Sequence, residues 1–239
     1  SVERSTDMDF NSSIERGEGF GIVVEEASDV FLHSTILYSH NATQLFVDNS
    51  VLNGKQCTIQ HGNECGVILQ NSDGTLSHCE ISNHHNINVQ ARKKSKMQIE
   101  RCEIHSGHEN GLLISKESIV NCNETVIKDH LSAQVAITEK SFCSMKDCLI
   151  VNGRHVGIYV EKKSECMLFQ CQITQNNNSA INVDRGIMRV YRCEISENNG
   201  NGILAVTNSL VEVDGCNFYY NQMPHIACKS KVKIYLSNS

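Results

Sequence analysis

The sequence predicts an all-β fold, a right-handed parallel β-helix (a solenoid) of about ten coils with 22–23 residues each. The first observation is a residue column that recurs in steps of 22, 23, 46, 23, 22 and 23 residues, with Thr125 filling the double step. Repetition at such a fixed period is typical of stacked architectures. The members of this column are Cys57, Cys79, Cys102, Cys148, Cys171, Cys193 and Cys216.

The second observation is an apolar residue two positions after each member of the cysteine column. One unit, MRVYRCEISENNGNGILAV from Met188 to Val206, shows apolar and polar residues alternating over three to five positions. That alternation is strand periodicity, and no window carries a helical stripe of ordinary length. A leucine-rich repeat has a similar period but needs several leucines and an asparagine at set offsets. The apolar column comprises Ile59, Ile81, Ile104, Ile127, Ile150, Ile173, Ile195 and Phe218.

The third observation is the nearly constant length of the turn that follows the apolar column. Eight residues separate most of its members from the next inward residue. Strands stacked at about 4.8 Å per coil require such regularity. Two exceptions are expected, nine residues from Ile36 to Leu45 and six from Ile81 to Ile87, and the shorter turn should dent the surface.

Residues 1–239 are predicted to form a single β-helix domain. A solenoid needs polar caps at its ends, and neither end of the sequence shows one. We therefore expect the chain to be an excised part of a longer protein.

Composition narrows the classes of protein and partner. Forty per cent of the residues are hydrophobic without a long apolar run, and the polar start is not a signal peptide, so no membrane span is expected. The net charge of −6 is spread along the chain, and there is no tryptophan. A nucleic-acid-binding rod would carry a basic stripe and stacking aromatics. We expect no nucleic acid, no metal and no cofactor.

Twelve cysteines could indicate disulfides in a secreted chain. Inward cysteines on successive coils would have parallel Cβ vectors about 4.8 Å apart, beyond the separation that a disulfide prefers. Reduced cysteine is a small apolar residue that suits such a column. Most of the thiols are therefore predicted to be reduced core residues, and the protein to be cytoplasmic.

A histidine-rich turn is the candidate binding site. Clustered histidines could bind a partner, a sugar or a metal, or respond to pH. Metal binding is not expected, because stacked side chains diverge whereas metal ligands converge. The alternative is a solvated turn that merely tolerates histidine. The predicted surface consists of His85, His108, Glu109, His130, Arg154 and His155.

Two acidic residues form the competing, catalytic candidate. Glu161 and Asp184 each follow an equivalent strand end, so they should stack one coil apart. That spacing is near the separation of the carboxylates in retaining glycosidases, and one pKa of such a pair should rise. Neighbouring Lys162 and Arg185 favour an ordinary solvated turn instead. A separate column of Asn176, Asn198 and Asn221 is predicted to be a structural amide ladder.

The pattern Cys-x-Ile, a polar turn with Asn and then Gly-Ile-x-Val resembles the repeat of pectin-lyase-like parallel β-helix proteins. The resemblance implies the fold along nearly the whole chain and says little about activity. The lyases and hydrolases of that superfamily use paired aspartates and Arg or Lys motifs. This chain has no Asn-x-Asp with a later Asp-Asp, no Gly-His-Gly and no Arg-x-x-Pro-x-x-Arg motif, with only Ser-Gly-His-Glu-Asn-Gly around His108. The chain is therefore predicted not to be an enzyme.

Among these proteins, the reduced cysteine ladder is most similar to the intracellular eukaryotic branch. Resemblance to the Shc-binding protein/Nessun dorma family implies cytokinesis partners at the spindle or midbody, together with carbohydrate binding. Resemblance to β-helical F-box receptors, the second choice, implies substrate recognition for a ubiquitin ligase. The predicted function is a non-catalytic scaffold that binds a protein partner, and the alternative is a polysaccharide-active lyase or hydrolase.

Overall fold

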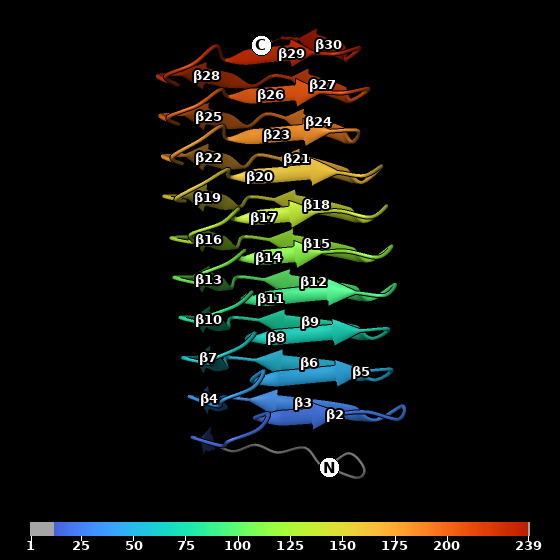
Figure 1. Cartoon of the computed structure of the whole chain (residues 1–239), viewed down its shortest axis with the longest axis vertical. Coiled ribbons are helices and arrows are strands. Elements are labelled where there is room, and N and C mark those ends of the chain that lie inside the picture. The colour runs from blue at the N-terminus through green and yellow to red at the C-terminus, as the bar shows by residue number, and fades with distance from the viewer. Residues whose placement is uncertain (1–11, 239) are drawn as a thin grey trace.

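The computed structural model describes residues 12–238, which form thirty strands and no helix. The strands wind into three parallel sheets of ten strands each, stacked along one axis (Figure 1). Each coil contributes one strand to each sheet, so the prediction of a ten-coil parallel β-helix is confirmed. Residues 12–238 therefore contain no helix that could span a membrane.

We name each sheet after its first strand. The β1 sheet contains β1 (Ser13–Glu15), β4 (Ile36–Tyr38), β7 (Thr58–Gln60), β10 (Glu80–Ser82), β13 (Glu103–His105), β16 (Val126–Lys128), β19 (Leu149–Val151), β22 (Gln172–Thr174), β25 (Glu194–Ser196) and β28 (Asn217–Tyr219). The β2 sheet contains β2 (Ile22–Val24), β5 (Leu45–Asp48), β8 (Val67–Gln70), β11 (Val89–Arg92), β14 (Leu112–Ile114), β17 (Val135–Ile137), β20 (Ile158–Glu161), β23 (Ile181–Asp184), β26 (Ile203–Val206) and β29 (Ile226–Lys229). The β3 sheet contains β3 (Asp29–His33), β6 (Val51–Lys55), β9 (Asp73–Ser77), β12 (Lys96–Glu100), β15 (Ile119–Asn123), β18 (Phe142–Lys146), β21 (Glu165–Phe169), β24 (Ile187–Tyr191), β27 (Leu210–Asp214) and β30 (Lys233–Ser237).

The register of coil four corrects the expected short turn. Val89, not Ile87, pairs with Val67 of the preceding coil. Ile81 occupies the expected inward position, so its turn again spans eight residues. The predicted dent is wrong, because strand pairing selected an inward residue two positions further along the chain.

Coil two is corrected in the same way. Leu37, not Ile36, pairs with Ile59 and is fully buried, whereas Ile36 is exposed. Leu37 and Leu45 are therefore the inward residues, and they too are eight residues apart. The turn between the β1 and β2 sheets has one length throughout.

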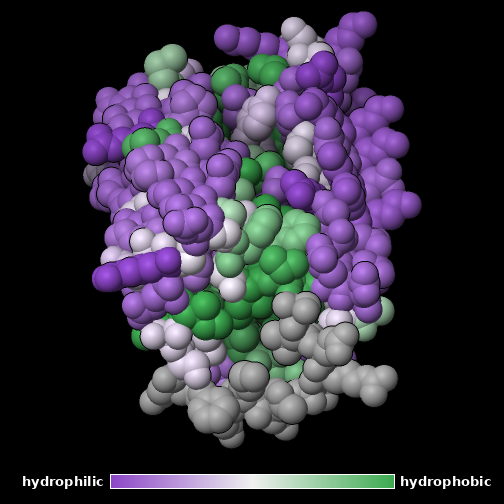
Figure 2. All heavy atoms as spheres, turned by 60° about the horizontal axis from the view of Figure 1, so that its bottom comes forward, coloured by the Kyte–Doolittle hydropathy of each residue, from purple (hydrophilic) through white to green (hydrophobic). Residues whose placement is uncertain are grey.

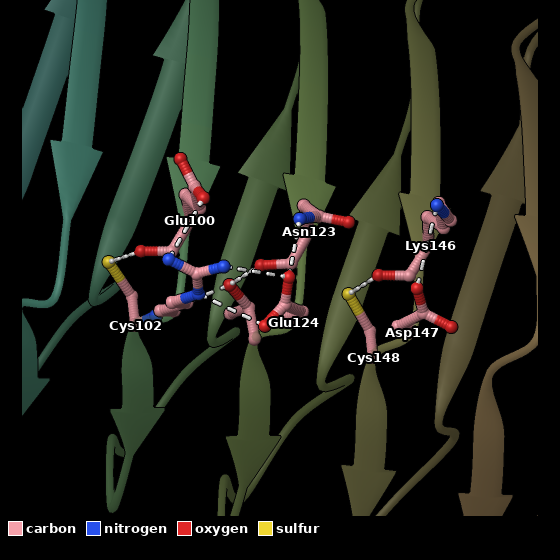
Figure 3. Close-up of polar contacts among 9 residues, drawn as sticks. Glu100, Cys102, Asn123, Glu124, Lys146, Asp147 and Cys148 are labelled. Atoms are coloured by element: carbon pink, nitrogen blue, oxygen red, sulfur yellow. Dashed lines mark hydrogen bonds and ion pairs between the residues drawn. The ribbon is translucent and has the colours of Figure 1, made fainter.

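The cysteine column lies at the corner between the β3 and β1 sheets. The Cys102 thiol donates to the Glu100 carbonyl oxygen at 3.3 Å, and Cys148 makes the equivalent bond to Lys146 (Figure 3). The sulfur of Cys102 also accepts the backbone N–H of Cys79 at 3.4 Å. Each thiol thus satisfies corner backbone groups that would otherwise be buried without a partner.

Thr125 makes the same contacts with oxygen. Its hydroxyl donates to the Asn123 carbonyl oxygen at 2.9 Å and accepts the N–H of Cys102 at 3.4 Å. This equivalence explains why threonine fills the double step. None of the twelve cysteines, which all lie within residues 12–238, forms a disulfide, and all except Cys228 are buried, so the prediction of core thiols without disulfides is confirmed.

A serine column, absent from the sequence-based expectations, stabilises the corner between the β2 and β3 sheets. The Ser95 hydroxyl accepts the backbone N–H of Ser72 and donates to the Arg92 carbonyl oxygen at 2.7 Å. Equivalent bonds connect successive coils from Ser28 to Ser164. The third corner, between the β1 and β2 sheets, contains the predicted histidines.

Candidate binding groove

The third corner contains a buried column three residues after each inward residue of the β1 sheet. His84 and His130 are 0% exposed and His40 is 2% exposed. His130 was predicted to lie on a binding surface, and that prediction is wrong, because its ring points into the corner. Along the chain the column reads Gly17, His40, Gly62, His84, Gly107, His130, Gly153, Asn176, Asn198 and Asn221.

Glycines provide the space that each histidine ring fills. A Cβ at Gly66 would lie 2.4 Å from Cδ2 and Nε2 of His84, closer than real Cβ contacts come. A Cβ at Gly107 would lie 2.9 Å from Cδ2 of His130. Every ring in coils one to seven therefore alternates with a coil that carries glycine in this column.

Hydrogen bonds define the state of the two central rings. Nδ1 of His84 accepts the N–H of Gly62 at 3.0 Å, and its Nε2 has no partner. Nδ1 of His130 donates to Gln134 at 2.7 Å, and its Nε2 accepts from Asn88 at 3.1 Å. Burial lowers the pKa of His84 to about 3 and that of His130 to about 4, so both rings are neutral near pH 7.

The other five residues of the predicted site are exposed. His85 and His108 stack on neighbouring coils with ring centroids 4.9 Å apart and planes inclined by 27°. Glu109, Arg154 and His155 continue along the same turn. Their role in binding stays a prediction, and they form one bank of a groove.

The floor of that groove is the outer face of the β2 sheet. Figure 2 shows an apolar strip recessed between two hydrophilic banks. The second bank consists of the turns that carry Lys94, Lys116, Lys140 and Lys162. The floor is the column of central outward residues, Val23, Phe46, Ile68, Gln90, Leu113, Ala136, Tyr159, Asn182, Leu204 and Ala227.

The floor differs from the outer face of the β1 sheet. On the β1 sheet, Glu103 pairs with Lys128 at 2.6 Å, an ordinary solvated ion pair. In the groove, by contrast, Ile68 and Ala136 are each only 7% exposed because the banks rise beside them. Sequence reasoning missed this floor, although the signal was present in the apolar x of Gly-Ile-x-Val.

A pocket of about 480 Å³ opens in the groove at coils five to eight. Leu113, Ala136 and Val156 give it an apolar wall, and Tyr159, Glu161 and Asn182 give it a polar end. His155, from the predicted site, also lines it. The pocket therefore adjoins both the histidine-rich bank and the predicted acidic pair.

Glu161 and Asp184 do stack in register on adjacent coils. Burial raises the pKa of Glu161, but hydrogen bonds from Thr138 at 2.8 Å and Lys162 at 3.2 Å outweigh it, so its pKa lies below the usual value. The expected upward shift is therefore not found at Glu161. Arg185 binds Oδ2 of Asp184 at 2.7 Å, and Glu161 is an ionised carboxylate at neutral pH.

The sequence was compared with models of known protein families. A family model described as the right-handed beta helix region matches residues 43–191, more than half of the chain. The chain belongs to the right-handed β-helix family. No curated protein sequence matches it.

Solved structures of this right-handed β-helix show the same fold at low identity. The catalytic domain of Agl-KA has a TM-score of 0.71 at 8% identity, over 85% of this chain and 48% of that one. The A-module of the Azotobacter vinelandii mannuronan C-5 epimerase AlgE6 scores 0.54 at 9% identity, over 94% and 85%. Pectate lyase Pel9A scores 0.51 at 9% identity, over 90% and 78%. The chain spans about half of the length of the Agl-KA domain, and these likenesses concern the fold alone.

Proposed function

We propose that this β-helix is a non-catalytic interaction domain whose β2-sheet groove binds an extended segment of a partner protein. The supporting observation is the floor, which is apolar on coils one to three and again on coils five and six, while the outer face of the β1 sheet carries a charged pair. Contiguous exposed apolar surface is typical of interaction sites.

The shape of the groove suits an extended segment. From Phe46 to Leu204 the floor crosses seven coil steps, about 34 Å at one strand spacing per step. An extended polypeptide of about ten residues has this length. Covering the floor would contribute about 25 cal/mol per Å² of apolar area removed from water.

Two further observations support a binding role and an intracellular setting. An ionised Glu161 is poorly suited to act as a general acid, because its pKa is lowered rather than raised. Buried thiols without disulfides suit a reducing compartment. We therefore retain the proposed cytoplasmic location and the proposed kinship with the Shc-binding protein/Nessun dorma branch.

Charge placed on the floor tests the proposal. Phe46→Lys and Leu113→Lys should abolish capture of the partners that the full-length protein retains from lysate, as quantified by mass spectrometry. Thr58→Lys and Val126→Lys, at outward positions of the β1 sheet, are the matched controls. Thermal unfolding of all four variants is the control that checks whether each of them folds. Equal capture by the floor and control variants would reject the groove as the binding site.

A polysaccharide-active enzyme is the second candidate. It is favoured by the in-register pair of Glu161 and Asp184 and by structural neighbours that are named as an epimerase and a lyase. Uronate polymers should then give unsaturated products or reducing ends, and Glu161→Gln should abolish the activity. A wild-type chain that leaves a panel of uronates and galactosides unchanged removes this candidate.

A further inference from the structure

The groove changes its chemistry towards the C-terminal end of the pocket. Floor residues Leu113 and Ala136 are followed on the next two coils by Tyr159 and Asn182. Glu161 lies two residues beyond Tyr159 on the same strand face, and Asp184 lies two beyond Asn182. An apolar channel thus ends at two stacked carboxylates.

Hydrogen-bond acceptors at this end exceed the donors available to them. Oδ1 of Asn182 and Oδ1 of Asp184 are shielded from water and have no partner among the described residues. The Tyr159 hydroxyl donates to Oε2 of Glu161 at 3.2 Å. An unpaired acceptor of this kind destabilises the empty site, and a ligand that brings donors would relieve it.

The neighbouring cations contact both carboxylates from the bank turn, and of the two carboxylates Glu161 lines the pocket. Lys162 binds Oε1 of Glu161, and Arg185 binds Oδ2 of Asp184. Both cationic side chains are more than half exposed and belong to the bank turn rather than to the floor. The second oxygen of Asp184 is the unpaired one.

We propose that this pocket receives an arginine side chain of the partner segment, an inference that rests on the proposed function. The aliphatic stem packs on Leu113, Ala136 and Val156. The guanidinium donates to Glu161 and, after rotation of the amide, to Asn182. Arginine suits this end better than lysine because its planar fork of five donors reaches several acceptors at once. A neutral sugar would place hydroxyl acceptors as well as donors against the carboxylates.

Peptide titration of the ¹⁵N-labelled chain tests the inference. The probe is an acetylated decapeptide of alternating valine and serine with one central arginine, and its twins carry citrulline or lysine instead. The arginine peptide should shift the amide signals of Leu113, Ala136 and Asn182 and bind at least about tenfold more tightly than the citrulline peptide. Lysine should give intermediate binding. Galacturonate, added separately, tests the polysaccharide alternative.

Single-residue variants test whether the arginine peptide binds at this pocket. Glu161→Gln should reduce binding of the arginine peptide to the level of citrulline. Asn182→Leu, which copies Leu204 of the next coil, should weaken it with the fold intact. Glu103→Gln on the β1 sheet is the control and should change nothing.

Three results would overturn the arginine pocket. They are equal binding of the citrulline and arginine peptides, no shift with any arginine peptide, and shifts at these amides with galacturonate alone. The capture experiment separates this failure from failure of the groove. If Leu113→Lys abolishes partner capture while Glu161→Gln leaves it intact, the groove stands and only its arginine specificity is rejected.

Discussion

Coils one to seven and coils eight to ten fill the same corner in two different ways. In the first region a buried ring such as His84 fills the space of two coils, and the coils between carry glycine, as at Gly107. In the second region every coil carries an asparagine, as at Asn176 and Asn198. The backbone repeat is the same in both regions. The side chains at this corner, however, repeat every two coils in the first region and every coil in the second.

The two solutions differ in how completely they pair their polar groups. Oδ1 of Asn198 accepts both the backbone N–H of Asn176, at 3.0 Å, and its side-chain amide, at 2.9 Å. Nδ1 of His84 likewise accepts the backbone N–H of Gly62, but Nε2 of the same ring has no hydrogen-bond partner. The asparagine ladder is paired and does not titrate, whereas the histidine region buries a titratable ring at each even coil from two to six. The following changes test that difference.

Acidification should have the largest effect, and it should act through the histidine region. The pKa values of His84 and His130, about 3 and about 4, lie below the ordinary 6.5 of an unfolded histidine. The stabilisation from burying these two neutral rings is complete above pH 6.5 and is lost as the pH falls through 6.5 towards the folded values of about 4 and about 3, because the unfolded chain binds the protons first. The free energy of unfolding, from urea titrations between pH 7 and 4.5, should fall by a few kcal/mol. A double His84→Asn, His130→Asn variant that keeps the full slope would contradict this account.

A side chain at a glycine of the histidine region should have the next largest effect. Gly66→Ala places a Cβ 2.5 Å from the carbonyl oxygen of Asn88 as well as against His84, so we expect a loss of about 2–3 kcal/mol. Ala180→Gly, in the same column but in the asparagine region, is the control and should cost about 1 kcal/mol because glycine loses more backbone freedom on folding. Thermal unfolding measures both. Equal losses would show that the ring does not impose the glycine.

Exchanging histidine and asparagine between the two regions should lower the free energy of unfolding by unequal amounts. His84→Asn keeps an acceptor for Gly62 but leaves part of the ring volume empty, which should cost about 1–2 kcal/mol. Asn198→His places a ring between two asparagines rather than two glycines, so overpacking should cost about 2–3 kcal/mol. Chemical denaturation gives both values. A stabilising Asn198→His would end the distinction between the regions.

The smallest effect is expected where both regions share one solution. Thr125→Cys restores the thiol that most neighbouring coils carry at that corner, and both side chains donate to the carbonyl two residues earlier. We expect a change of less than about 1 kcal/mol. Denaturation under reducing conditions measures it. A loss comparable with that of Gly66→Ala would mean that the thiol and the hydroxyl are not equivalent at this corner.

Sequence reasoning recovered the coils and their inward columns because each depends on residues close together in the chain. It chose Ile36 and Ile87 instead of Leu37 and Val89, since apolar residues one or two positions apart compete for the inward position and only pairing with neighbouring coils selects one. It also separated His84 and His130 from the asparagine column, although all lie three residues after an inward residue of the β1 sheet. That shared offset was a usable signal. The groove floor was harder to predict, because an outward apolar residue becomes part of a groove only when the banks rise beside it.

The period and the type of residue were enough to determine a parallel β-helix with inward thiols, because backbone pairing at every coil forces equivalent residues into one column. Tertiary structure alone decided that His130 is buried while His108 is exposed. The space around each ring depends on whether residues about 22 positions away carry a Cβ, and only stacking brings those residues together.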